Sequence, residues 1–366
     1  MCEIHNKASL AARRHRTIHV SHAVGTVLAH DITEIRRDEF KGTAFRRGHI
    51  IRQDDIRHLQ RLGKEQLFVL DVADDEMHED EAAYEISCAL MGEGVEIQDT
   101  PREGKINLIA GRDGILKINT EALLQFNMLG EIMCATIHNN TLVKKGQVIA
   151  GTRAIPLVVK RDIILEAISI GQRARNSAFP QNGSGIIEVR ELRRFLAGVV
   201  ITGNEIFYGR INDAFAPIIK DKLMNLGGEV IDICYVPDDE GIISQSLERM
   251  IEAGADLLIT TGGMSVDPDD VTRFAVKRLA GEIVYGSAVL PGAMFLLAYI
   301  RQADFPIPIL GIPACGMYHK TTVFDLVLPR ILAGENIGRK ELAELGHGGL
   351  CLNCKECRYP VCPFGK

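Results

Sequence analysis

Hydrophobic and polar positions in the last part of the chain follow a strand–loop–helix rhythm. An apolar run over 198–202 predicts a strand, and apolar residues at helical spacing over 211–226 predict a helix that stops at a pair of glycines. The rhythm continues with predicted strands at 230–236, 255–259 and 307–310 and predicted helices at 241–253, 271–279 and 317–332. Strands that alternate with helices indicate an α/β fold with a mostly parallel sheet and right-handed crossovers.

The chain before this region has a less regular pattern. Residues 18–72 alternate short strand and helix signals, among them an amphipathic helix with Asp54 as its predicted N-cap and Gly63 as its predicted C′ residue. Residues 82–195 contain short apolar runs separated by Gly and Asn turn signals, which predict a β-rich or α+β domain. The predicted division is an N-terminal α+β segment at 1–72, a β-rich domain at 73–195, an α/β domain at 196–337 and a cysteine-rich tail at 338–366.

Composition narrows the classes of function. The 366 residues are 46% apolar and 25% charged, which is ordinary for a globular chain of two or three domains. The net charge of −6 and the absence of Trp argue against nucleic-acid binding. The longest apolar stretch, at 293–300, is too short to cross a bilayer, and the N-terminus lacks a signal-peptide pattern. We therefore expect a cytoplasmic protein with neither a nucleic-acid nor a membrane partner.

The turn over 260–270 carries the clearest chemical signal. It contains Gly262 and Gly263 and joins a predicted strand to a predicted helix, so its free backbone N–H groups suit an anion. Three carboxylates follow that suit a hard cation such as Mg²⁺, namely Asp267, Asp269 and Asp270. Together they indicate a phosphorylated ligand bound with a metal ion, although Asp270 also suits the N-cap of the next helix. Because parallel sheets bind ligands at the carboxyl ends of their strands, the loops after Thr202, Thr260 and Leu310 should converge there.

The order of these loops resembles a known family. Segments 200–205, 237–239 and 260–270, with Asp213 after the first, resemble the molybdopterin-binding domain of molybdopterin molybdenumtransferases, gephyrin-like proteins and molybdopterin adenylyltransferases. The resemblance continues at 290–292, 311–313 and 327–330 and covers the region 197–335, and residues 23–32 resemble the opening of the molybdenumtransferases. Residues 73–195 and the tail after Leu345 have no counterpart in that resemblance.

The resemblance implies a three-layer α/β domain, a homo-oligomer and a reaction. Molybdenumtransferases insert molybdate into adenylylated molybdopterin and release AMP with the help of a divalent cation, here Mg²⁺. By position, Asp270, Asp269 and Glu205 would be catalytic, and Asp267 and Asp270 would hold the metal. The residues implied to bind molybdopterin or its adenylylated form are Thr202, Gly203, Asn204, Thr261, Gly262, Gly263, Ser265, Pro291, Gly292, Gly311, Pro313 and Cys315.

Departures from the family pattern keep other functions open. Asn204 replaces an Asp, Asp267 replaces a Gly, and Cys315 stands in a loop where the family has Gly-Asn-Pro. These changes favour a second hypothesis, a non-catalytic molybdopterin carrier, maturation factor or sensor that works with a molybdoenzyme. The turn at 261–263 and the segment 268–273 also resemble nucleotide-derivative hydrolases of the competence-damage type, which is a third hypothesis. Cys315 also fits a small buried apolar residue.

The tail after residue 345 carries a cysteine cluster. Four thiols stand at the spacing C-x₂-C-x₂-C-x₄-C, namely Cys351, Cys354, Cys357 and Cys362. In a reducing compartment such a cluster predicts a metal site, either a Cys₄ zinc ion or an iron–sulfur cluster, and a redox relay of free thiols is a third alternative. A zinc ion would staple the C-terminus, whereas a cluster would handle electrons or molybdenum. Residues 345–349 would be a flexible tether, with His347 as an additional candidate ligand.

Overall fold

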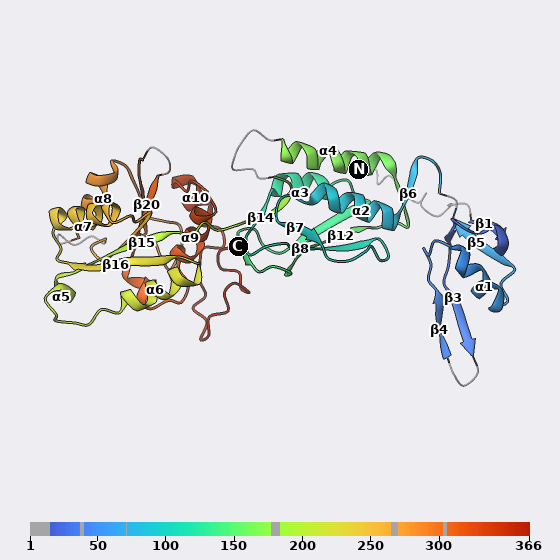
Figure 1. Cartoon of the computed structure of the whole chain (residues 1–366), viewed down its shortest axis with the longest axis horizontal. Helices are drawn as coiled ribbons and strands as arrows, with labels where there is room; N and C mark the ends of the chain where they lie inside the picture. The colour runs from blue at the N-terminus through green and yellow to red at the C-terminus, as the bar shows by residue number, and fades with distance from the viewer. Residues whose placement is uncertain (1–14, 37–39, 71, 177–183, 265–269, 303–305) are drawn as a thin grey trace, which may run out of the picture. The chain divides into compact units, whose positions relative to one another are not determined.

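The computed structural model describes residues 15–36, 40–70, 72–176, 184–264, 270–302 and 306–366. The chain forms two compact units (Figure 1). The first unit comprises the stretches up to Ala110, Asn119–Thr136 and Gly146–Glu188, and the second comprises Gly111–Ile118, Ile137–Lys145 and Val189–Lys366. Two short excursions of the chain, around residues 115 and 140, therefore belong to the second unit.

The first unit begins with a small sheet and one helix. Strands β1 (His15–His19), β5 (Gln66–Leu70) and β2 (Val27–Leu28) pair in the order β1-β5-β2, beside helix α1 (Gln53–Arg61) and the hairpin β3 (Ile32–Arg36) and β4 (Phe40–Phe45). Gly63 has a φ of 73°, which confirms it as the C′ residue of α1. The prediction of Asp54 as N-cap was wrong: the N-cap is Arg52, whose N–H donates to the carboxylate of Asp55 at 2.8 Å.

The remainder of the first unit is α+β. Its main sheet has the order β10-β12-β8-β7, and a two-stranded sheet pairs β13 with β6. The strands are β6 (Glu76–His78), β7 (Val95–Ile97), β8 (Lys105–Ala110), β10 (Ile132–Thr136), β12 (Val148–Ala154) and β13 (Val158–Lys160), and the helices are α2 (Glu79–Leu90), α3 (Thr120–Asn127) and α4 (Arg161–Arg175). A further small sheet joins β11 (Leu142–Val143), β9 (Gly114–Ile118) and β14 (Ile187–Arg190), of which β9 and β11 belong to the second unit.

The second unit is built on a six-stranded sheet. Its order is β16 (Glu229–Val236), β15 (Leu196–Thr202), β17 (Leu257–Thr261), β20 (Ile307–Ile312), β19 (Leu296–Ile300) and β18 (Ile283–Tyr285). The first four strands are parallel, β19 is antiparallel to β20, and β18 is antiparallel to β19. The register pairs Thr202 with Val236, and Thr261 with Ile312. The carboxyl ends of the four parallel strands therefore lie along one edge.

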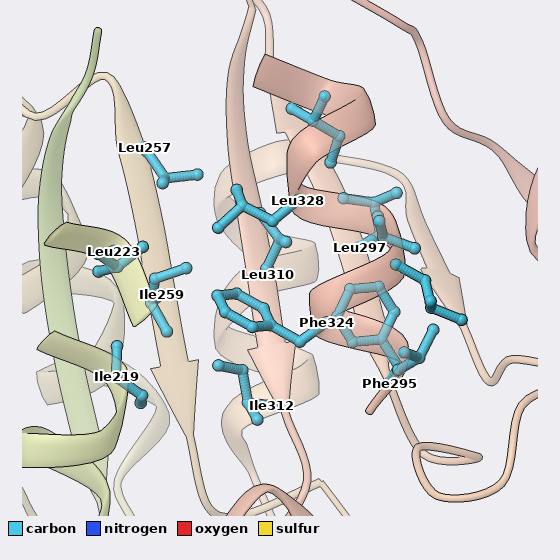
Figure 2. Close-up of a cluster of buried hydrophobic side chains, with 14 of the residues drawn as sticks. Ile219, Leu223, Leu257, Ile259, Phe295, Leu297, Leu310, Ile312, Phe324 and Leu328 are labelled. Atoms are coloured by element: carbon cyan, nitrogen blue, oxygen red, sulfur yellow. The ribbon is translucent and has the colours of Figure 1, made fainter. Parts of the chain in front are cut away.

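Helices cover both faces of this sheet and make it the middle of three layers, as the sequence predicts. Alternate strand residues face opposite layers, since Ile259 and Leu257 join one apolar cluster and Leu258 joins the other. Helices α6 (Phe215–Asn225) and α9 (Val323–Leu332) pack on the first face, where Ile219 and Phe324 meet the strand residues (Figure 2). Helices α7 (Glu240–Glu252) and α8 (Thr272–Ala280) pack on the second. The loops at the carboxyl edge thus stand on a rigid core.

Candidate functional site

The loops after β15 and β16 are tied together at the carboxyl edge. Gly203 follows β15 with a φ of 143° and leads into the short helix α5 (Asn204–Phe207). The N–H of Asn204 donates to the Asp238 carboxylate at 2.9 Å, and the Asp238 N–H lies 3.4 Å from the Asn204 side-chain oxygen. Asn204 therefore joins the two loops. It does so at a position where the family named in the sequence analysis carries an Asp. The exposed Glu205 folds its carboxylate back over Gly203.

The glycine turn after β17 is held against the end of β15. Gly262 and Gly263 have φ values of 81° and 56°, which L residues with a side chain rarely adopt. A Cβ on Gly262 would lie 2.5 Å from the carbonyl oxygen of Thr202, and one on Gly263 would lie 2.5 Å from Oγ1 of Thr272. The buried Thr202 hydroxyl donates to the carbonyl of Thr261 at 2.9 Å. Any side chain at these two positions would clash, so the glycines allow the turn to lie close to Thr202 and Thr272.

Two threonine hydroxyls at the end of β17 are buried. Among the described residues, neither Oγ1 of Thr260 nor Oγ1 of Thr261 has a hydrogen-bond partner. A buried hydroxyl without a partner costs about 1–3 kcal/mol, so such atoms are uncommon away from functional sites. Thr261 lies directly before the glycine turn, so its unpartnered hydroxyl is close to the candidate site in the chain.

The acidic half of the turn is described only in part. Ser265, Asp267 and Asp269 lie outside the described residues. Asp270 is half-buried and precedes Val271, which is the N-cap of α8 and makes no side-chain cap hydrogen bond. The interpretation of Asp270 as the N-cap was therefore wrong.

Arg273 adds a positive charge that is absent from the residues predicted from the sequence. Its guanidinium carbon lies 4.8 Å from the ring centre of Phe274 and 5.8 Å from that of Tyr285. The Tyr285 hydroxyl in turn donates to the carbonyl of Met264, which is buried beneath the turn. Nε of Arg273 is buried and has no partner among the described residues. The sequence signal that could have identified Arg273 is its place in the first turn of a helix. The helix dipole disfavours a cation there unless an anion binds nearby.

Three other residues that the resemblance assigns to the ligand site serve packing in the structure, namely Pro291, Gly292 and Gly311. Gly292 has a φ of 130°, and a Cβ there would lie 2.4 Å from Cγ1 of Val323. The N–H of Val323 lies 3.3 Å from the carbonyl of Pro291, so both predicted ligand residues here seat the start of α9. A Cβ on Gly311 would lie 2.3 Å from Sδ of Met264, so Gly311 makes room for the residue beneath the glycine turn.

Cys315 lies just past Pro313, in the short helix η2 (Ala314–Met317) after β20. Its thiol is half-buried, and burial raises its pKa. A neutral thiol at this place is a poor nucleophile and a poor metal ligand, because both tasks need the thiolate. The carbonyl of Cys315 accepts the N–H groups of Tyr318 and His319, which closes the turn toward α9.

The four tail cysteines line one cavity of about 420 Å³. Cys351 and Cys362 are half-buried against the apolar core, whereas Cys354 and Cys357 are exposed. The cavity wall is completed by residues 318–321, which directly follow η2. Within the described part of the chain, no three His, Cys, Asp or Glu side chains are already gathered around one point for a metal ion.

The tail is docked on the α/β domain, so the prediction of a flexible tether at 345–349 was wrong. The N–H of Cys351 donates to the carbonyl of Leu290 at 2.8 Å, and the Leu290 N–H donates to the carbonyl of Gly349 at 2.8 Å. Phe364 is only 3% exposed and belongs to the core beneath α9. Burial also raises the pKa of Tyr359 to about 12. His347 is not among the residues that line the cavity.

Cys357 stands out among the four thiols. Its Sγ lies 3.6 Å from the hydroxyl of Thr321. Hydrogen bonds from the Tyr359 backbone and from Thr321 lower the pKa of Cys357. The geometry thus favours a thiolate at the exposed side of the cavity.

Two family models match the chain. Residues 17–71 match a family described as a domain of unknown function, and residues 198–333 match the family described as a probable molybdopterin binding domain. The chain carries a domain of the probable molybdopterin-binding family. The matched range begins in β15 and ends just after α9, so this molybdopterin-binding domain includes the glycine turn and the loops described above.

Curated relatives match a shorter stretch. CinA-like proteins from Mycobacterium tuberculosis H37Ra and Mycobacterium avium 104 are 41% identical over 85 residues and 38% identical over 94 residues. These stretches are 23% and 25% of this chain, and they are 20% and 22% of the relatives. The match therefore spans about a fifth of the length of those curated relatives.

The solved structures that are similar to the chain include molybdenum or tungsten cofactor proteins and a CinA protein. The tungsten cofactor synthesizing protein MoaB from Pyrococcus furiosus has 20% identity and a TM-score of 0.33, over 39% of this chain and 97% of that one. CinA from Thermoplasma acidophilum, of unknown function, has 19% identity and a TM-score of 0.29, over 34% and 90%. A molybdenum cofactor biosynthesis protein from Pyrococcus furiosus has 14% identity and a TM-score of 0.25, over 91% and 66%.

Within the described residues, no helix is long and apolar enough to pass through a bilayer. This agrees with the short apolar runs of the sequence.

Proposed function

We propose that the molybdopterin-binding domain binds a phosphate-bearing pterin of the molybdopterin type at the carboxyl edge of its sheet and acts in molybdenum cofactor biosynthesis. The observation that carries the proposal is the turn at Gly262 and Gly263, which follows the carboxyl end of β17 and is held close to Thr202; a glycine turn that joins a strand to a helix suits an anion. The Thr261 hydroxyl and the Arg273 guanidinium supply further donors at that place.

The proposal includes a divalent cation. Asp270 follows the glycine turn in the chain, and Asp267 and Asp269 come just before it. Carboxylates beside an anion site suit Mg²⁺, which would neutralise the charge of a pyrophosphate in adenylylated molybdopterin. With Mg²⁺ held there, molybdate insertion with release of AMP is the reaction that the residue set supports, and we assign Asp269, Asp270 and Glu205 to it.

Titration of the anaerobically purified protein with molybdopterin and with its adenylylated form tests this proposal. We expect tight binding of both, Mg²⁺-dependent binding of the adenylylated form, and release of AMP once molybdate is added. Binding without AMP release would support a carrier or sensor in place of a transferase. Absence of binding of either pterin would refute the proposal.

A pair of glycine variants makes the test specific for the turn. Gly262→Ala places a Cβ 2.5 Å from the Thr202 carbonyl and should abolish pterin binding. Gly227→Ala is the matched control, because Gly227 has the same φ of 81° and no atom within 4 Å of the added Cβ. We expect the control to retain wild-type affinity. Equal losses in both variants would show that backbone strain alone, rather than the turn, weakens binding.

The second candidate function is hydrolysis of a nucleotide derivative. It is favoured by the 41% identity with CinA-like proteins over 85 residues. The same glycine turn and acidic loop would then hold the pyrophosphate of a nucleotide with its cation. Incubation with ADP-ribose and NAD in the presence of Mg²⁺, followed by chromatography of the products, distinguishes the two functions. Turnover of a nucleotide without pterin binding would favour this second candidate.

We also propose that the tail binds a metal through Cys351, Cys354, Cys357 and Cys362, as a zinc ion or an iron–sulfur cluster. The spacing of the four cysteines supports this proposal, and all four are among the residues that line one cavity. Metal analysis of the purified protein tests it. Protein that contains no stoichiometric metal after anaerobic purification and after loading with either zinc or iron and sulfide would refute it.

A further inference from the structure

We propose that His78 and Glu79 form a pH-sensitive latch that holds the small domain of residues 17–71 on the rest of the first unit. The latch is closed while the Glu79 carboxyl carries a proton, and it opens when this carboxyl ionises. Both parts belong to the first unit, and the latch is independent of pterin binding and of the metal site in the tail.

The small domain has a core of its own. Its apolar cluster includes Val20, Phe45, Leu59 and Val69 and contains no residue of α2. In the part of the chain that the structure describes, its strands pair with one another, in the sheet β1-β5-β2 and the hairpin of β3 and β4. Neither a shared sheet nor this cluster joins the small domain to α2, so contacts at the start of that helix decide how the two are held together.

The turn at Gly48 meets the start of α2. Nε2 of His78 lies 2.7 Å from the carbonyl oxygen of Gly48, and Nδ1 accepts the N–H of Asp80 at 3.2 Å. Because Nδ1 accepts a hydrogen bond, Nε2 carries the proton and donates it to the Gly48 carbonyl. His78 is 6% exposed, so this hydrogen bond is shielded from water. One side chain thus caps α2 and ties it to the small domain.

The Glu79 carboxyl is enclosed between two glycine turns. A Cβ on Gly48 would lie 3.0 Å from Oε1 of Glu79, and a Cβ on Gly104 would lie 3.1 Å from Oε2. The first turn belongs to the small domain and the second precedes β8. Glu79 is 4% exposed, so a carboxylate at this place loses most of its hydration. The neutral carboxyl therefore fits the space between the turns better than the ionised one.

Charged groups from each segment around Glu79 act on its carboxyl. Burial is the largest cause of its raised pKa, and the neighbouring Asp80 carboxylate adds to it. Arg153 of β12 lowers the pKa, Glu103 of the turn before β8 raises it, and Arg47 of the small domain lowers it. The balance places the pKa of Glu79 at about 7, compared with an ordinary value of 4.5. Ionisation above pH 7 thus leaves a poorly hydrated charge between the turns, and opening of the latch hydrates it.

An ion pair between Arg46 and Glu103 also joins the two turns at the surface. Their side chains are 72% and 54% exposed, and exposed pairs contribute little to stability. The buried contacts of His78 and Glu79 therefore decide whether the latch is closed. Because the pKa of Glu79 is about 7 in the closed latch and 4.5 in solvent, the equilibrium constant for opening should rise about tenfold from pH 6 to pH 8.

The test follows the Nε2 proton of His78 by NMR in the full-length protein with isotope-labelled histidine. Because His78 is buried, this proton reaches solvent when the latch opens. After correction for the intrinsic effect of pH on imidazole exchange, we expect it to exchange about tenfold faster at pH 8 than at pH 6. Backbone amides of α4 should exchange more slowly at both pH values. Exchange of the His78 proton that is independent of pH, or as slow as that of the α4 amides, would overturn the inference.

A carboxyl variant identifies the titrating group. Glu79→Gln stays neutral at every pH, so it should remove the tenfold pH dependence of the His78 proton exchange. Glu166→Gln is the matched control, because the Glu166 side chain is 51% exposed in α4 of the same unit and pairs with Arg173. We expect the control to keep the wild-type dependence. A wild-type dependence in Glu79→Gln would overturn the inference.

A glycine pair tests the contact itself. Gly48→Ala places a Cβ 3.0 Å from Oε1 of Glu79 and 2.7 Å from Cδ2 of Leu157, so it should speed exchange of the His78 proton at both pH values. Gly25→Ala is the control in the same small domain, because Gly25 has a similar φ of 82° and no atom within 4 Å of the added Cβ. Equal acceleration in both variants would show that strain in the small domain, rather than the latch, controls the exchange.

Discussion

The hydroxyl oxygen of Thr202 lies 3.2 Å from the hydroxyl oxygen of Thr272, so the end of β15 touches the start of α8 across the glycine turn. Both residues are buried. This contact, with the hydrogen bond from Thr202 to the Thr261 carbonyl, fixes how far the turn can move away from the sheet. The anion-binding geometry of the turn thus depends on a side chain that points inward.

Thr202→Val should therefore destabilise the second unit and weaken ligand binding. The substitution keeps the shape of the side chain but leaves the Thr261 carbonyl and the Thr272 hydroxyl without their partner, at a cost of about 1–3 kcal/mol. Urea unfolding measures the change. Thr260→Val is the control, because that hydroxyl is buried with no partner among the described residues, so its removal should be neutral or stabilising. A larger loss in Thr260→Val than in Thr202→Val would contradict this account.

Arg273→Gln should lower the affinity for an anionic ligand by about ten- to a hundredfold, because a charge-assisted hydrogen bond contributes roughly 1.5–3 kcal/mol. The side chain stays long and polar, so stability should change little. Lys277→Gln is the control, since Lys277 is an exposed cation in the last turn of the same helix. Titration at two salt concentrations would show that Arg273 acts through charge if the loss shrinks at high salt. Equal losses in both variants would point to net charge alone.

The parts of this fold that could be predicted from the sequence are those set by local pattern. Strands such as 255–259 are buried on both faces and read as apolar runs, and the helices between them keep a 3.6-residue period. The glycine turn was visible because only Gly tolerates its φ values. The antiparallel strands β18 and β19 were not predicted, because their place at the edge of the sheet depends on tertiary pairing.

Other features could not be predicted because they depend on contacts between distant residues. Phe364 lies near the end of the chain, and nothing in its neighbours indicates that it enters the core beneath α9. From the sequence alone, Asn204 cannot be distinguished from a ligand residue, because its hydrogen bond with Asp238 becomes visible only in the structure. The charge of Arg273 matters because the Tyr285 and Phe274 rings hold it near the turn.

Glu79 should make the stability of the first unit depend on pH. Burial, with a smaller contribution from Asp80, raises the pKa of Glu79 from 4.5 to about 7. Because the folded pKa lies above the unfolded one, the stabilisation is complete below pH 4.5 and is lost as the pH rises toward 7. Glu79→Gln should remove this loss and make the first unit about 1–3 kcal/mol more stable than wild type above pH 7.

Thermal unfolding between pH 5 and pH 8 measures the effect of Glu79. Glu166→Gln is the control, since the Glu166 side chain is 51% exposed and pairs with Arg173 at the surface of the same unit. We expect its unfolding temperature to follow the wild-type pH profile. If Glu79→Gln also kept the wild-type profile, Glu79 would not be the titrating group.

Glu335→Gln should destabilise the second unit strongly. The Glu335 carboxylate forms salt bridges with Nζ of Lys117 at 2.7 Å and with the Arg330 guanidinium at 3.0 Å. All three side chains are nearly buried. These two cations hold the pKa of the Glu335 carboxyl below its usual value despite burial. Removing the charge leaves two buried cations without a counter-ion, which costs about 3–5 kcal/mol in denaturant unfolding. Glu344→Gln, an exposed partner of Lys340 at 3.8 Å, should change stability by less than about 0.5 kcal/mol.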